Sequence, residues 1–182
     1  MTSYSQGLLY GLGAYTIWGG FGLFFTLLAD VPSDEVLAHR VIWCLLIVIG
    51  LILITGKLRL TLAILRQPKT LGWLTLTSIL ISLNWWVFIW AVAQKEVVQA
   101  SLGYFLSPLV AVILGRIFLG ERLNRLQQAS VVLATIGVLW QLWALGKVPW
   151  IALSLSSLFG FYALIRKQVQ VNSISGLTIE SL

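Results

Sequence analysis

The stretch that decides the fold is residues 35–55, which reads EVLAHRVIWCLLIVIGLILIT. After His39 and Arg40 no charged side chain follows before Lys57. An α-helix needs about 20 mostly apolar residues to cross the hydrocarbon core of a bilayer. The stretch is therefore predicted to be a transmembrane helix that carries its two basic side chains in the early turns.

Further segments of the same character follow one another along the chain, separated by short charged loops. The mean hydropathy is +0.94 and only 10% of the residues are charged. A soluble domain of this size would leave much of that apolar surface in water, whereas lipid accepts it. The sequence predicts an all-α integral membrane protein, surrounded by the lipid bilayer, with six transmembrane helices at residues 7–29, 35–55, 70–93, 97–119, 126–145 and 148–165.

The charged residues of the loops predict the orientation in the membrane. The loops of one side hold Asp30, Asp34 and Glu35, and their basic residues are only Lys95 and Lys147. Cytoplasmic loops carry the excess of basic residues, so the N-terminus is predicted to be cytoplasmic. The basic residues are spread over several loops rather than gathered on one face, which argues against a nucleic-acid partner. The other loops and their borders carry Lys57, Arg59, Arg66, Lys69, Arg116, Arg122, Arg125, Arg166 and Lys167.

Catalytic signatures are missing from the sequence. It contains no H-E-x-x-H, G-x-S-x-G, Walker lysine loop or C-x-x-C, and these motifs carry metal, nucleophile, nucleotide and redox chemistry. His39 and Cys44 are the only histidine and cysteine, too few for a metal site. Every Asp and Glu falls in or beside a predicted loop, so no carboxylate is expected inside the membrane. We expect no enzyme, no cofactor and no metal.

Polar and aromatic side chains enter three predicted helices at one depth, in the outer half of the bilayer. Arg40 is predicted either to line a cavity or to reach the outer headgroups and pair with an acid such as Glu35. His39 favours a packing or interfacial role, and Asn84 can simply join helices. An apolar cavity with a few polar groups is typical of a small-molecule site. The converging residues are His39, Arg40, Asn84, Trp85, Trp86, Gln99, Ser101, Tyr104 and Ser107.

The small residues and Pro108 have two possible roles, in helix packing or in helix flexibility. Pairs of small residues four positions apart allow helices to pack closely in lipid. Alternatively, the run Trp18-Gly19-Gly20 and Pro108 loosen their helices near the midplane, as in many carriers. The small pairs are Gly7 with Gly11, Ser130 with Ala134, and Ser156 with Gly160.

Several motifs resemble one family of membrane carriers. Residues 100–110 (ASLGYFLSPLV) and 118–122 (FLGER) resemble the end of the first repeat in EamA-type carriers of the drug/metabolite transporter superfamily. Residues 14–19 (AYTIWG) fit the same family. Residues 39–43 (HRVIW) and 84–92 (NWWVFIWAV) resemble its RarD branch of bacterial inner-membrane permeases. The resemblance extends along nearly the whole chain.

The resemblance implies ten helices in two inverted five-helix repeats, and alternating-access transport of a small metabolite or drug-like molecule. Residues 7–145 would form the first repeat, residues 148–166 the sixth helix, and residues 167–182 the start of a second repeat that is otherwise missing. We therefore expect no transport by this chain alone. The alternative is a non-transporting membrane component, or a fragment that needs a complementary half or a second copy.

The family residues that line the path carry over by motif position and depth. Glu121 and Arg122 are expected instead to fix the cytoplasmic end of segment 97–119, with Glu121 as an N-terminal charge of the next helix. The path candidates are Trp18, His39, Arg40, Asn84, Trp85, Tyr104 and Pro108.

Overall fold

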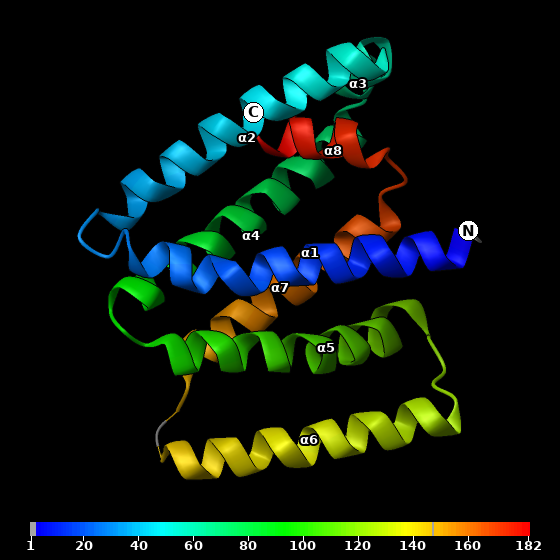
Figure 1. Cartoon of the computed structure of the whole chain (residues 1–182). Coiled ribbons are helices and arrows are strands. Elements are labelled where there is room, and N and C mark those ends of the chain that lie inside the picture. Colours follow the sequence, from blue (N-terminus) through cyan, green and yellow to red (C-terminus); the bar gives the residue numbers. More distant parts are fainter. Residues whose placement is uncertain (1–2, 147) are drawn as a thin grey trace.

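The computed structural model describes residues 3–146 and 148–182, and over these residues the chain is helical (Figure 1). The charges of the loops predict that Lys147 lies on the outer side of the membrane. Lys147 is not among the residues that the structure describes. All six predicted segments are found as helices. The described helices are α1 (Ser3–Thr26), α2 (Ser33–Thr55), α3 (Leu58–Leu65), α4 (Pro68–Ala93), α5 (Val97–Leu119), α6 (Arg125–Leu145), α7 (Trp150–Gln168) and α8 (Ser173–Glu180).

Five of these helices are long and apolar enough to cross a membrane, namely α1 from Ser5 onward, α2, α4, α5 and α6. The sixth predicted span, α7, is 19 residues long but is not among them. It contains several serines and ends in Arg166 and Lys167. It packs chiefly against α5 and α4, and Ser156 on it is buried. The six-span expectation thus holds for five helices, and the sixth, α7, is more polar and packs against α4 and α5.

Close contact between α5 and α7 depends on two glycines. A Cβ atom on Gly103 would lie 2.9 Å from the Cβ of Leu155, and one on Gly160 would lie 2.6 Å from a methyl of Val110. The pair of Ser156 and Gly160 therefore acts as the sequence predicts. In contrast, nothing lies within 4 Å of a Cβ built on any glycine of α1. Neither Gly19 nor Gly20 interrupts α1, which is continuous from Ser3 to Thr26.

The junction between α5 and α6 corrects one expectation. Gly120 ends α5 with φ of 64°, in the left-handed region that favours glycine. Asn124 then caps α6: its side chain accepts from the backbone N–H of Gln127, whose own side chain accepts from the backbone N–H of Asn124. Glu121 precedes α6, so it is not an N-terminal charge of that helix.

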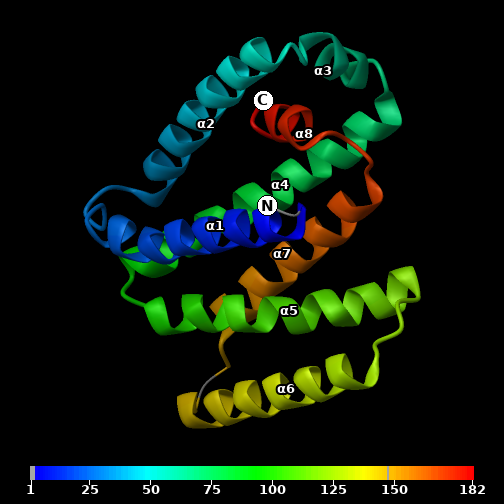
Figure 2. The ribbon, with the colours of Figure 1, turned by 45° about the vertical axis from the view of Figure 1, so that its right-hand side comes forward.

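Two short helices form where no helix was predicted. The helix α3 lies in a segment predicted to be a loop, and α8 lies in the polar segment that follows α7. Figure 2 shows α8 enclosed by α2, α3 and α4, in agreement with its contacts. The hydroxyl oxygens of Thr61 on α3 and Ser175 on α8 are 2.9 Å apart and buried. Most of α8 therefore lies inside the bundle, whereas Leu182 after it is exposed.

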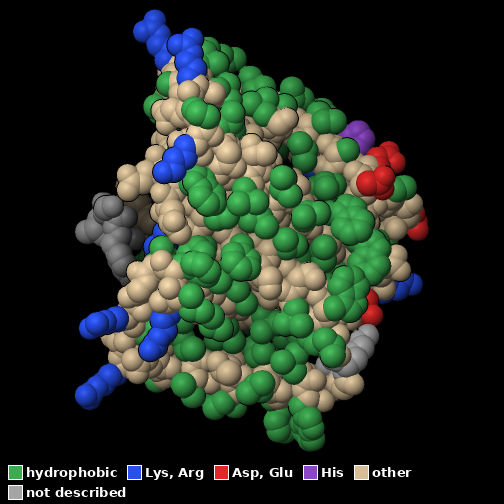
Figure 3. Space-filling model, turned by 180° about the vertical axis from the view of Figure 1, so that it is seen from behind, with side chains coloured by type: hydrophobic (Ala, Val, Ile, Leu, Met, Phe, Trp, Pro, Cys, Tyr) green, Lys and Arg blue, Asp and Glu red, His purple; other side chains and the backbone are tan. Residues whose placement is uncertain are grey.

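The surface separates into an apolar band and two charged edges. Figure 3 shows hydrophobic side chains across much of one face, with most of the visible Lys and Arg along one edge and the visible Asp and Glu along the opposite edge. Large apolar side chains are widely exposed on α1, α2 and α6. Lipid is the solvent in which such a surface is stable.

Candidate functional site

Three helices bring Arg40, Trp85 and Tyr104 to one depth. Arg40 lies seven residues after the start of α2, Trp85 eight residues before the end of α4, and Tyr104 seven residues after the start of α5. At about 1.5 Å per residue, each is about 10–12 Å from its helix end. The loops α1–α2 and α4–α5 lie at the same end of the bundle (Figure 1). The depth expected from the sequence is therefore reproduced.

The Arg40 guanidinium lies over aromatic rings. Its central carbon is 2.9 Å from the centroid of the Trp85 ring and 5.9 Å from that of Phe21. Such contacts are cation–π interactions. Within residues 3–146 and 148–182, no carboxylate forms an ion pair with Arg40. Pairing with Glu35, one alternative from the sequence, is not found.

Aromatic side chains connect Arg40 with α5. The ring of Trp85 meets Phe21 at 6.2 Å and Phe88 at 6.1 Å between centroids, and Phe88 meets Tyr104 at 5.6 Å. These rings lie edge to face, the arrangement that aromatic quadrupoles favour. We call Phe21, Arg40, Trp85, Phe88 and Tyr104 the outer site. It joins α1, α2, α4 and α5 around one cation.

Asn84 lies beside the outer site but has a structural role. It is only 2% exposed, and its side-chain amide donates to the backbone carbonyl of Leu155 on α7 at 2.9 Å. This bond joins α4 to α7 inside the bundle. Of the two interpretations open from the sequence, the contact favours the joining of helices.

The remaining path candidates are not brought into the outer site. Trp18 is 45% exposed and meets only Tyr15 among the described aromatic rings, at 5.8 Å. His39 is exposed on α2. Pro108 is exposed too, and α5 continues through it. Depth along a helix can be read from a sequence, but the direction of a side chain around the helix depends on packing.

Glu121 and Arg122 lie at the end where α5 stops. Glu121 forms an ion pair with Lys167 at the end of α7, and its carboxylate occupies the space beside Gly115. Arg122 is exposed. The ion pair ties the end of α5 to that of α7, a structural role of the kind expected for Glu121.

A second polar cluster, which the sequence did not reveal, surrounds Glu180 on α8. Its carboxylate accepts from the hydroxyl of Thr77 at 2.6 Å and from that of Tyr162 at 3.5 Å. The Nε of Arg166 is 3.4 Å from the same carboxylate. The Glu180 side chain is 3% exposed. Glu180 lies at a helix end, as expected, but its burial was not predicted from the sequence. We call Glu180, Arg166, Tyr162 and Thr77 the inner cluster.

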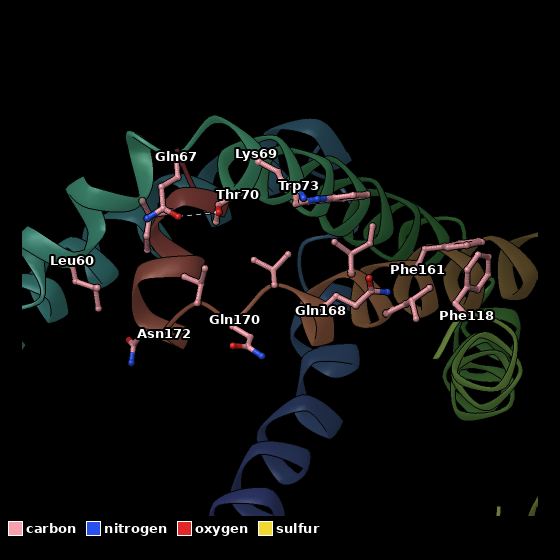
Figure 4. Close-up of a pocket in the computed structure, with 15 residues that line it drawn as sticks. Leu60, Gln67, Lys69, Thr70, Trp73, Phe118, Phe161, Gln168, Gln170 and Asn172 are labelled. Atoms are coloured by element: carbon pink, nitrogen blue, oxygen red, sulfur yellow. Dashed lines mark hydrogen bonds between the residues drawn. The ribbon is translucent and has the colours of Figure 1, made fainter. Parts of the chain in front are cut away.

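An open pocket of about 830 Å³ lies near the inner cluster. Figure 4 shows Gln67, Thr70 and Trp73 on one side and Gln168 and Gln170 on the other, with Gln67 accepting from the Thr70 hydroxyl at 3.1 Å. The lining comes from α3, the α3–α4 linker, the start of α4, the end of α5, the end of α7 and the α7–α8 linker. The pocket contains amides but no carboxylate.

The outer site and the inner cluster offer different groups to a ligand. The outer site supplies a cation and aromatic faces, and the inner cluster supplies one buried carboxylate with its partners. Among the residues that the structure describes, no three His, Cys, Asp or Glu side chains gather in a group that could hold a metal ion.

Comparison with known proteins identifies the family. The EamA-like transporter family matches residues 5–143. "Protein RarD" of Salmonella typhi is 45% identical over 177 residues, which cover 97% of this chain and 60% of that protein. "Uncharacterized transporter YojE" of Bacillus subtilis is 40% identical over 179 residues, and "Chloramphenicol-sensitive protein RarD" of Pseudomonas aeruginosa is 34% identical over 181 residues. Each of these two alignments also covers 97% of this chain and 60% of the relative.

The chain thus spans about 60% of the length of these relatives. No solved structure matches it. The family match extends over α1 to α6 and includes all five helices that are apolar enough to cross a membrane. We conclude that this multi-pass membrane protein belongs to the EamA-like transporter family.

Proposed function

We propose that the chain is the first part of a bacterial inner-membrane permease that moves a small organic molecule by alternating access. The observation that carries the proposal is the outer site. There the Arg40 guanidinium, with which no carboxylate of the described residues pairs, lies over Trp85. The Trp85 ring belongs to a chain of aromatic contacts with Phe21, Phe88 and Tyr104. Small-molecule sites combine apolar walls with a few polar groups that orient the ligand.

The outer site favours a substrate with an apolar or aromatic body and an anionic or strongly polar group. Arg40 offers a planar donor array that suits a carboxylate or phosphate. Trp85, Phe88 and Tyr104 offer faces and edges for the apolar body. A metabolite or drug-like molecule of this kind fits both features.

The second half of the site would come from a second repeat. The relatives are longer than this chain, and in inverted-repeat carriers the substrate lies between the two repeats. We propose that residues 7–145 form the first repeat, that residues 148–166 form the sixth helix, and that residues 167–182 begin the second repeat. The alternative is a membrane component that does not transport by itself.

We also propose that the N-terminus is cytoplasmic. The segment between α2 and α4, the α5–α6 loop and the helix ends that border them carry most of the basic residues, whereas the α1–α2 loop and the start of α2 carry acidic ones. The separation of basic and acidic edges in Figure 3 supports this orientation.

Uptake into vesicles tests the proposal. The chain is co-expressed with the downstream half of a complete carrier, and radiolabelled probes are small aromatic acids and chloramphenicol, which the name of one relative suggests. A carrier gives saturable uptake and counterflow of at least one probe, both of which require Arg40. Linear uptake that equals that of empty vesicles for every probe would favour the non-transporting alternative.

A further inference from the structure

The transport proposal leaves the pocket of about 830 Å³ without a role. Its walls include the start of α4 and the ends of α5 and α7. The outer site lies toward the opposite ends of α4 and α5, near the end of the first and the start of the second. The pocket is therefore at the level of the other membrane surface, on the side that the basic residues mark.

Polar and aromatic lining residues follow one another in the same order on two helices. On α4, Lys69 is the second residue, and Trp73 lies about one turn further in. On α7, Gln168 is the last residue, and Phe161 lies about two turns further in, about 10 Å along the axis. Such spacings keep residues on one face of a helix. Each helix thus presents a polar group at the membrane surface and an aromatic ring nearer to the bilayer centre.

The aromatic part of the pocket is open toward the surroundings of the bundle. Figure 4 shows Phe118 and Phe161 together at one end of the pocket. Trp73, Phe118 and Phe161 are 46%, 60% and 42% exposed, and the buried Leu164 lines the pocket with them. In a membrane, an exposed apolar wall meets acyl chains. A substrate path lies inside a carrier, between its repeats, so the open wall favours lipid over the transported molecule.

The polar part of the pocket complements a negative charge. Lys69 lines it, and the ammonium group of Lys57 donates to the side-chain oxygen of Asn172, a further lining residue, at 3.3 Å. Among the described residues, no carboxylate lines the pocket. Side-chain amides both donate and accept hydrogen bonds, as hydroxyl groups beside an anion require. The amides of the pocket belong to Gln67, Gln168, Gln170 and Asn172.

We propose that this pocket binds an anionic phospholipid of the phosphatidylglycerol type, from the leaflet on the basic side. The phosphate lies near Lys69 and Lys57, the headgroup hydroxyls bind the amides, and an acyl chain lies along Trp73 and Phe161. Basic pockets between transmembrane helices bind anionic lipid headgroups in the same way. The lipid site is separate from the outer site. A lipid bound there holds the start of α4 to the end of α7.

Lipid binding to the purified chain in detergent tests the proposal. Native mass spectrometry measures the dissociation constants of dioleoylphosphatidylglycerol and dioleoylphosphatidylcholine, which have the same acyl chains. The wild-type chain should bind one phosphatidylglycerol at least about tenfold more tightly, because each lysine near an anionic headgroup contributes about fivefold. Equal affinities for the two lipids would overturn the proposal.

Lys69→Gln should weaken the binding of phosphatidylglycerol about fivefold and change that of phosphatidylcholine little. Arg122→Gln is the matched control, because it removes the same charge from an exposed residue on the same side that does not line the pocket. It should bind both lipids as the wild type does. An equal loss of affinity in the two variants would mean that only the overall surface charge attracts the lipid, and no loss in Lys69→Gln would refute the site.

The source of the anion is tested with the soluble headgroup. A large excess of glycerol 1-phosphate, which carries the phosphate and hydroxyls without acyl chains, should not displace the bound lipid. Displacement would identify a site for a soluble anion and overturn the lipid proposal.

Gln168→Trp tests the position of the site independently of charge. Gln168 is exposed and lines the pocket, so the larger indole occupies space that the headgroup needs. The preference for phosphatidylglycerol should disappear, while an unchanged thermal midpoint in detergent shows that the chain is folded. Wild-type lipid binding by this variant would place the lipid elsewhere. None of these measurements involves transport, so their outcome does not depend on the proposed function.

Discussion

Arg40 illustrates at the residue scale how a cation is kept inside an apolar bundle. A charged side chain at the bilayer centre costs about 2.5–3.5 kcal/mol on insertion scales. A cation–π contact returns about 0.5–2 kcal/mol. The Trp85 and Phe21 rings therefore offset only part of the cost. The part of the cost that the rings do not offset favours the binding of water or of an anionic ligand group to Arg40. A substrate site needs such a tendency to bind.

Replacement of Arg40 should remove transport without removing the protein. In a complete carrier, we expect Arg40→Ala to reduce uptake at least about tenfold, the factor that corresponds to about 1.4 kcal/mol. Arg40→Lys should restore little, because lysine keeps the charge but not the planar donor array. Uptake and membrane abundance are measured together.

Arg59→Ala is the control for a lost cation, since Arg59 is exposed on α3, away from the outer site. It should transport as the wild type does. Normal uptake by Arg40→Ala would mean that Arg40 serves only as an anchor at the headgroups.

We expect a substitution of Gly103 to lower the stability of the chain, because Gly103 lies at the α5–α7 contact. In Gly103→Ala the new methyl group would lie 2.9 Å from the Cβ of Leu155, which is fixed to the backbone. Such overpacking costs about 1–3 kcal/mol. The thermal midpoint of the chain in detergent should fall. Gly137→Ala on α6, where nothing lies within 4 Å of the added atom, should leave it unchanged or raise it. Equal losses in the two variants would place the cost in the backbone rather than in the contact.

At the scale of elements, hydropathy predicted the long helices well, because each must cover its own length of membrane. The short helices α3 and α8 were not predicted. Neither is long enough to carry a membrane signal, and α8 is fixed by contacts with distant residues such as Thr61. The carboxylate of Glu180 was missed for the same reason. A position near a polar tail gives no sign of burial until the partners on α4 and α7 are known.

The outer site was predicted in part. Arg40, Trp85 and Tyr104 were found together because depth follows directly from the distance to a helix end. Trp18 and His39 have similar chemistry, yet they lie outside the site. The helices α1 and α2 are apolar around most of their circumference, so the sequence does not indicate which face turns inward.

The orientation of the elements can be tested by cysteine labelling. With Cys44 replaced by serine, Ser33→Cys at the start of α2 should react with an impermeant maleimide in intact cells. Gln67→Cys, exposed between α3 and α4, should react only after permeabilisation, because the basic residues beside it place it in the cytoplasm. The reverse pattern would invert the proposed topology.

On the scale of the whole molecule, the bundle has a well-packed centre and open sides. The contacts of α7 with α5 and α4 form the centre, while α6 packs on α5 at the edge (Figure 1). Both α1 and α6 bury little of their surface. The chain matches about 60% of the length of its relatives. The relatives therefore have further residues that can cover such faces. The open sides are therefore the surfaces where we expect a second repeat.

The purified chain should insert into liposomes without transporting. A second copy inserted in the same orientation would present the same face again, not the inverted one that completes a carrier site. We expect tracer uptake at the level of protein-free liposomes, and recovery when the downstream half is reconstituted with it. Saturable uptake by the chain alone would show that one repeat suffices.

The central place of α7 has a consequence for biosynthesis. Translation reaches α7 only after the five more apolar long helices, and its serines and terminal basic residues give it a weak tendency to partition from the translocon into lipid by itself. Its partners α4 and α5 are synthesised earlier, and α6, which comes between, settles along α5 without filling the space beside α4. The Gly103 face of α5 thus stays uncovered in the nascent bundle until α7, the least apolar of the described long helices, packs against it.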